Sequence, residues 1–154
     1  MARPTTRRDH LLRDAYLVVT VTAERTRNEL EAICLGHGLT IAQYPILWTL
    51  CLGGHPEGLA MSQLADGLVT KGADTTRLVS RLVDAGYVVR SSSPGDRRKV
   101  LVSVTDEGRR AFEAVTPEIK AAHRRQFAQL SDAQLEQLTA ALNTTLWSTP
   151  GEAS

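Results

Sequence analysis

Two arginines, Arg77 and Arg81, stand four residues apart in a stretch that alternates short polar and apolar runs, residues 71–85. In an α-helix this spacing places both guanidinium groups on one face. The apolar residues fall on the opposite face: Leu78, Val79, Leu82 and Val83. An α-helix fits the major groove of DNA, where arginine contacts guanine edges or phosphates. The spacing therefore predicts a DNA-reading helix over residues 71–85, ended by Gly86 in the left-handed conformation.

Further candidates for DNA contact lie in the first turns of this helix: Ala73, Asp74, Thr75 and Thr76. Asp74 could accept a hydrogen bond from a cytosine amino group, or it could simply favour the positive end of the helix dipole. Arg77 and Arg81 repel each other at this spacing, by about 0.2–0.5 kcal/mol, unless phosphates or guanines neutralise them. The competing interpretation is an ion pair between Arg81 and Asp84 on a solvated face.

A basic hairpin is predicted directly after the helix. Residues 87–90 and 99–104 are β-prone, and the polar connection at 91–98 contains a Pro-Gly turn. Arg98 is the strongest single candidate, because an arginine at a hairpin tip can enter a narrow A·T-rich minor groove. Asp96 can orient its guanidinium if the backbone is extended there. Arg97 and Lys99 are expected to contact the DNA backbone, although a hairpin tip can also carry charge only for solubility.

Helical patterns flank this region on both sides. Residues 9–35 predict a long helix whose apolar positions exceed what a small domain can cover, which indicates a partner subunit. Residues 40–43 resemble a capping box for a helix reaching Leu52, and Pro45 should bend that helix, unless the helix starts later. Thr105 should cap a helix that runs past Pro117 to about Leu130. Residues 131–134 form a second capping box, for a last helix.

Composition places the chain among globular proteins. It has 154 residues, of which 42% are hydrophobic and 23% charged, with a net charge of +1. Residues 71–110 alone hold nine Lys/Arg against five Asp/Glu, a local charge of +4 at the predicted DNA-reading elements. No segment reads as a membrane span or a secretory signal, and the unpatterned Cys34 and Cys51 favour a reducing cytoplasm. The cysteines are expected to be structural thiols rather than redox sensors.

No catalytic or metal-binding constellation is recognisable. The four histidines have no ligand spacing toward Cys or carboxylates, and there is no nucleophile–base pair, Gly-rich phosphate loop or useful carboxylate pair. We expect no cofactor, no metal and no enzymatic activity.

The residues of the central region also carry a family resemblance. They are Leu64-Ala65, Thr76-Arg77-Leu78-Val79, Leu82, Gly86, Tyr87-Val88, Asp96-Arg97-Arg98, Val100, Val104-Thr105 and Gly108. This set resembles the MarR family of bacterial transcription regulators, and the similarity extends over roughly residues 11–146. Ala60 departs from the pattern, because the family usually has a capping threonine there.

The resemblance implies one mainly helical (α+β) domain over residues 1–154. Within it, a winged helix-turn-helix would span 40–104, with a wing sheet of two or three strands, and dimerisation helices would span 9–35 and 105–147. The homodimer would bind a pseudo-palindromic operator in double-stranded DNA, usually as a repressor. A small aromatic or acidic effector would bind where the dimer helices meet the winged region, near Tyr16 and Trp48, although such aromatic residues are often part of the core. The alternative is a winged-helix module that binds protein rather than DNA.

Overall fold

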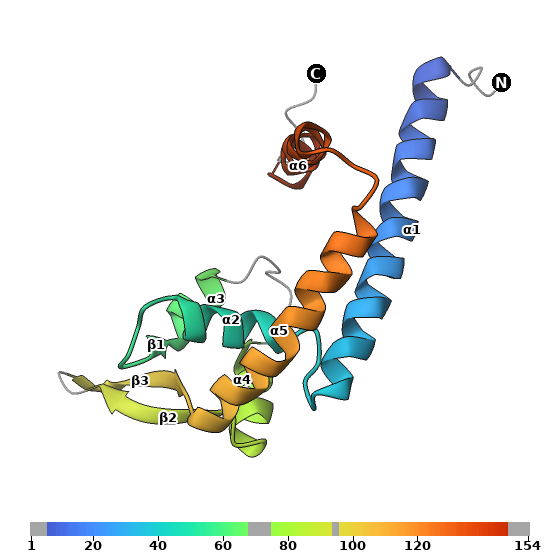
Figure 1. The fold of residues 1–154 in the computed structure, drawn as a ribbon. Coiled ribbons are helices and arrows are strands. Elements are labelled where there is room, and N and C mark those ends of the chain that lie inside the picture. Colours follow the sequence, from blue (N-terminus) through green and yellow to red (C-terminus); the bar gives the residue numbers. More distant parts are fainter. Residues whose placement is uncertain (1–5, 68–74, 94–95, 148–154) are drawn as a thin grey trace. The chain divides into compact units, whose positions relative to one another are not determined.

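A computed structural model describes residues 6–67, 75–93 and 96–147, with only the backbone described at 67, 96–98 and 147. The chain divides into two compact units, Met1–Lys120 and Ala121–Ser154. The first unit contains a mainly helical region with a three-stranded antiparallel sheet (Figure 1). We call this region, residues 40–104, the head. The predicted fold class, helices around a small wing sheet, is confirmed.

Helix α1, Arg7–Gly36, begins two residues earlier than predicted because Thr6 and Asp9 form a capping box. The Thr6 side chain accepts from the Asp9 N–H at 3.2 Å, and the Asp9 carboxylate accepts from the Thr6 N–H at 2.6 Å. The bond from the Thr6 N–H, and a second one that the Thr6 hydroxyl donates to the Asp9 carboxylate at 2.7 Å, lower the pKa of Asp9. Residues 6–25 are all exposed, so no other described residue of the chain buries the first half of this helix.

Helix α2, Tyr44–Leu52, starts after the predicted capping box, and the expected bend at Pro45 is wrong. Pro45 stands in the first turn of the helix, where a backbone N–H would have no intrahelical partner in any case. The box residues form the turn before the helix instead, since the Thr40 N–H donates to the Gln43 side-chain oxygen at 2.9 Å. The later start therefore removes the conflict with proline.

Helices α3, Met61–Gly67, and α4, Thr75–Asp84, form the helix-turn-helix. The apolar back of α4 is buried as predicted, with Leu78, Val79 and Leu82 in the core and Val83 packed against it. Gly86 ends this segment with φ = 75°, and the Tyr87 N–H donates to the Leu82 carbonyl at 2.9 Å. The predicted start of the reading helix at 71–74 lies outside the described residues.

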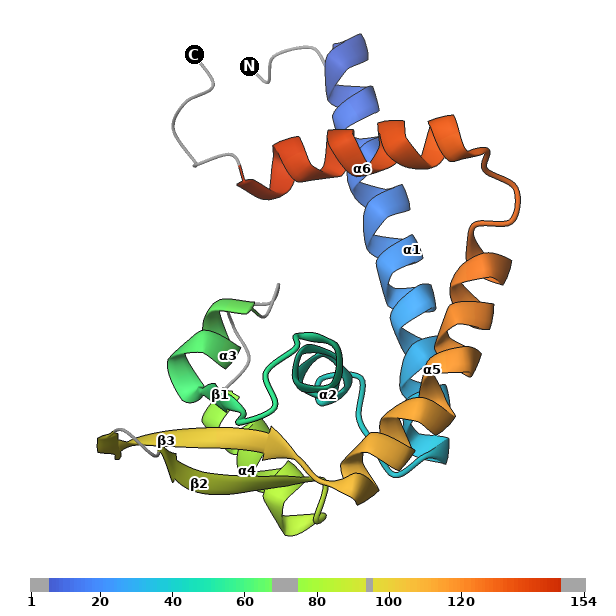
Figure 2. The same ribbon diagram turned by 60° about the vertical axis from the view of Figure 1, so that its left-hand side comes forward.

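The wing sheet has the strand order β1-β3-β2, with every pair antiparallel. Its strands are β1 (Leu59–Ala60), β2 (Val88–Ser93) and β3 (Asp96–Val104). Both long strands extend further than predicted, because residues 91–93 and 96–98, assigned to a loop, belong to β2 and β3. Ser91, Ser92 and Ser93 pair across the hairpin with Leu101, Val100 and Asp96. In Figure 2 the two strands run side by side and the hairpin tip points away from α5. The wing is therefore longer, and its tip shorter, than the sequence suggested.

Helix α5, Asp106–Gln126, continues through Pro117 as predicted but ends four residues before the expected Leu130. Beyond Gln126, backbone hydrogen bonds that span three residues replace those that span four, including one from the Leu130 N–H to the Phe127 carbonyl at 3.0 Å. In the second unit, helix α6, Asp132–Trp147, starts directly after Ser131, the first residue of the predicted capping box, in which the Ser131 N–H donates to Gln134 Oε1 at 2.9 Å.

Candidate nucleic-acid interface

The outward face of α4 carries the polar residues that the sequence placed there. Thr76, Arg77 and Arg81 are exposed, and Thr75 and Ser80 are partly exposed. Buried leucine and valine on the back of the helix prevent it from turning this face inward. Two arginines and two threonines are therefore presented together on one helix of the head. The described residues contain no ion pair between Arg81 and Asp84, so the competing interpretation of Arg81 is not realised here.

A hydrogen-bonded chain that the sequence analysis missed crosses from the wing to this helix. The guanidinium of Arg90, on β2, donates from Nη2 to Ser80 Oγ at 2.9 Å. The Ser80 hydroxyl in turn donates to the Thr76 carbonyl at 2.9 Å. Only the strand register could have revealed this contact, because it places Arg90 opposite the buried Val102.

The end of the wing adds further positive charge. Lys99 is exposed on β3, and the backbone of Asp96, Arg97 and Arg98 belongs to the same strand. The backbone there is extended, which is the condition under which Asp96 can orient Arg98. Positions Ala73 and Asp74 lie outside the described residues. The roles of all these residues toward DNA stay predictions.

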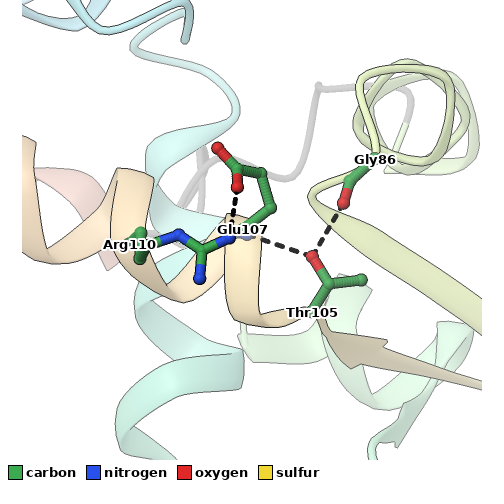
Figure 3. A network of polar contacts seen from close by, with 5 residues as sticks. Gly86, Thr105, Glu107 and Arg110 are labelled. Carbon is green, nitrogen blue, oxygen red and sulfur yellow. Dashed lines mark hydrogen bonds and ion pairs between the residues drawn. The ribbon is translucent and has the colours of Figure 1, made fainter.

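Thr105 joins the end of the helix-turn-helix to the start of α5 (Figure 3). Its hydroxyl donates to the Gly86 carbonyl at 2.7 Å and accepts from the Gly108 N–H at 3.0 Å, as an N-cap does. The Thr105 N–H donates to the Tyr87 carbonyl at 3.0 Å. A Cβ at Gly108 would lie 2.0 Å from the Tyr87 carbonyl oxygen, so only glycine permits this close packing. Glu107 and Arg110 form an exposed ion pair beside the network.

The two candidate effector residues differ in their surroundings. Trp48 on α2 is 42% exposed, and its ring lies 6.0 Å from that of Phe112 and 6.1 Å from that of Tyr44. Tyr16 on α1 is 68% exposed. No ring contact joins Tyr16 to Trp48 among the described side chains. Trp48 is therefore partly covered by two aromatic neighbours and partly accessible, whereas Tyr16 lies on the exposed first half of α1.

The cysteines have the character of structural thiols. Burial, with a smaller contribution from Glu31, raises the pKa of Cys34 to about 11. Burial also raises the pKa of Cys51, and nearby Arg109 opposes that shift. Thiolate, the reactive form, is therefore disfavoured at both positions. The described part of the chain holds no group of three or more potential metal ligands among His, Cys, Asp and Glu, and none of its helices is long and apolar enough to cross a membrane.

The head, its outward α4 face and the β2–β3 hairpin define a winged helix-turn-helix. A model of the MarR family matches residues 37–99. The chain is 28% identical over 129 residues to the HTH-type transcriptional repressor MdtR of Bacillus subtilis (strain 168), covering 84% of this chain and 81% of that protein. It is 33% identical over 79 residues to the HTH-type transcriptional regulator PecS of Dickeya dadantii (strain 3937), covering 51% of this chain and 48% of PecS.

A crystal structure of CouR from Rhodococcus jostii RHA1, bound to p-coumaroyl-CoA, superposes with a TM-score of 0.73 at 27% identity. The superposition covers 88% of this chain and 94% of that chain. The chain is therefore similar to the MarR family of winged helix-turn-helix transcription regulators, in its central region and over most of its length. The family resemblance of the sequence is confirmed, and the chain belongs to a class of regulators rather than of enzymes.

Proposed function

We propose that the protein is a homodimeric repressor that binds a pseudo-palindromic operator in double-stranded DNA and is released by a small-molecule effector. The observation that carries DNA binding is the outward face of α4, where Thr76, Arg77 and Arg81 are exposed over a buried apolar back. Each α4 enters a major groove one helical turn from its mate, and each wing reaches the adjacent minor groove. MdtR, which the chain resembles over most of its length, is named as a repressor.

Within each head, the proposed contacts divide by role. Arg77 and Arg81, with Ala73, Asp74, Thr75 and Thr76, lie on or before α4 and face the major groove. Arg98, oriented by Asp96, reaches the minor groove, while Arg97 and Lys99 bind phosphates. Phosphate contacts supply affinity, and base contacts supply sequence preference.

Exposed apolar side chains on α1, in the first unit, and on α6, in the second unit, support dimerisation. The exposed large apolar residues of α1 are Leu11, Leu12, Tyr16, Leu17, Val18, Val19, Val21 and Leu35. In α6 they are Leu138, Leu142 and Leu146. Exposed large apolar side chains in this number on two helices support an interaction site. We assign it to a second copy of the chain, through residues 9–35 and 105–147, because an operator of two half-sites requires two reading heads.

Release by an effector is supported by the partial exposure of Trp48 and by the structural similarity to CouR, whose crystal structure holds p-coumaroyl-CoA. The class of ligand proposed is a small aromatic or acidic molecule. An effector that prefers a spacing of the two heads incompatible with DNA must weaken DNA binding, and DNA must weaken effector binding equally.

The proposal is tested by fluorescence anisotropy with the duplex upstream of the protein's own coding region, over a series of salt concentrations. Arg98→Ala should weaken binding without changing the melting temperature, and Arg77→Ala should cost about 1–3 kcal/mol if Arg77 contacts a base edge. Arg13→Ala is the matched control, because it removes the same charge from an exposed site on α1.

The same salt series separates the alternative. A winged-helix module that binds protein has no reason to bind this duplex with an affinity that falls steeply with salt, whereas release of phosphate counterions requires it. Equal affinities for wild type, Arg77→Ala and Arg98→Ala would reject the proposed contacts.

A further inference from the structure

The bridge from Arg90 through Ser80 to Thr76 connects the two DNA-contacting elements of each head. Its two hydrogen bonds are both 2.9 Å long, and they use the Ser80 hydroxyl once as acceptor and once as donor. Arg90 belongs to β2, and Ser80 and Thr76 belong to α4. The bridge therefore joins the wing to the middle of the reading helix.

The sheet register explains why Arg90 can reach the helix. Val88 pairs with Val104 and Arg90 pairs with Val102, so Val88, Arg90 and Val102 lie on the same face of the sheet. Val88 and Val102 are buried in the core. Arg90 is one step further toward the hairpin tip on that face and remains exposed, which brings its guanidinium to the rim where β2 meets α4.

Apolar packing sets which face of α4 points outward, but it fixes the exact rotation of the helix less sharply than a directional hydrogen bond does. Leu78, Val79 and Leu82 hold the back of the helix, but hydrophobic contact is not directional. A hydrogen bond is directional, and the one at Ser80 lies near the outward face, three residues from Arg77. With side chains about 6 Å from the helix axis, a rotation of about 20° moves them by about 2 Å, enough to break a base contact.

We propose that Arg90 is a positioning residue for DNA binding, which through Ser80 holds α4 in the rotation at which its outward face and the wing engage neighbouring grooves together. This inference rests on the proposed DNA-binding function. It differs from a direct contact of Arg90 with phosphate, because a positioning role requires the Ser80 hydroxyl and a phosphate contact does not.

The test compares operator binding with binding to a scrambled duplex of the same length, using the full-length protein and the variants Ser80→Ala, Ser80→Thr, Arg90→Met and the double variant Ser80→Ala/Arg90→Met. Ser80→Ala keeps the net charge and raises helix propensity, so weaker binding cannot come from a melted helix or a lost charge. Ser80→Thr keeps a hydroxyl and serves as the conservative control.

We expect Ser80→Ala to weaken operator binding about 3- to 10-fold, with the scrambled duplex and the salt dependence unchanged, and Ser80→Thr to bind close to wild type. The double variant should bind the operator no more weakly than Arg90→Met alone, because both changes remove the same bridge.

Two results would overturn the inference. One is wild-type operator affinity in Ser80→Ala. The other is an Arg90→Met variant that loses affinity equally for both duplexes with a shallower salt dependence, which would make Arg90 a phosphate contact. A wild-type protein that binds neither duplex would instead refute the proposed function, together with the inference that depends on it.

Discussion

Removing the Thr105 hydroxyl should destabilise the connection between the end of the helix-turn-helix and the start of α5. Thr105→Val keeps the branched shape but deletes both the cap to the Gly108 N–H and the donor to the Gly86 carbonyl. Loss of an N-cap costs about 1 kcal/mol, and loss of a typical intramolecular hydrogen bond costs about another 1 kcal/mol. The expected decrease in the free energy of unfolding is therefore about 2 kcal/mol.

For a chain of this length, about 2 kcal/mol corresponds to a fall in melting temperature of about 4–8 °C. Thermal unfolding followed by circular dichroism measures it, with all proteins at one concentration because a dimer's stability depends on concentration. Thr105→Ser is the matched control, since it keeps the hydroxyl and should stay near wild type. Equal melting temperatures for Thr105→Val and Thr105→Ser would refute the assignment of both hydrogen bonds to this side chain.

Three further outcomes are expected. The pKa of Cys34 is raised from 9.0 to about 11, so the protonated thiol favours the folded state. This contribution to the free energy of unfolding is fully present below pH 9 and is lost as the pH rises through 11. The loss is at most about 2–3 kcal/mol. Cys34→Ala should flatten the decline of urea-unfolding free energy in that window. Val18→Glu on α1 should shift gel-filtration elution from dimer toward monomer, while Val89→Glu, the same change at an exposed valine on β2 outside the proposed dimerisation helices, should leave it unchanged. Trp48→Leu should reduce the ability of aromatic acids to release operator DNA without weakening DNA binding itself, measured by anisotropy.

Local patterns predicted the helical parts of the head well. The period of the apolar residues over 78–83 identified the buried back of α4, because each of those positions is set by the geometry of one helix. The caps at Thr105 and at Ser131 were predictable because each hydroxyl lies at the start of a helix, within three residues of the group that it bonds. Pro45 was misjudged because the capping box was taken as the helix start, although it forms the preceding turn.

The strands and the bridge depended on partners that are distant in sequence. Ser91, Ser92 and Ser93 are poor strand formers, yet they pair with β3, because pairing across a hairpin outweighs their intrinsic preference. The bond between Arg90 and Ser80 needs both the sheet register and the rotation of α4, neither of which a single stretch of sequence determines. The residues proposed to contact DNA remain predictions for the same reason, since their partner is another molecule.

The polar contacts of the head bear on how an effector could act. Thr105 ties the turn at Gly86 to α5, and Arg90 ties the middle of α4 to β2, so the reading helix is held at two separate points along its length. An effector that deformed α4 within its head would have to break directional hydrogen bonds at one of these points. Residues 6–25 of α1, which we propose to pack against a second copy of the chain, have no hydrogen bond to the head among the described residues. A shift in the spacing of two intact heads, as proposed above, would leave both of these contacts unbroken.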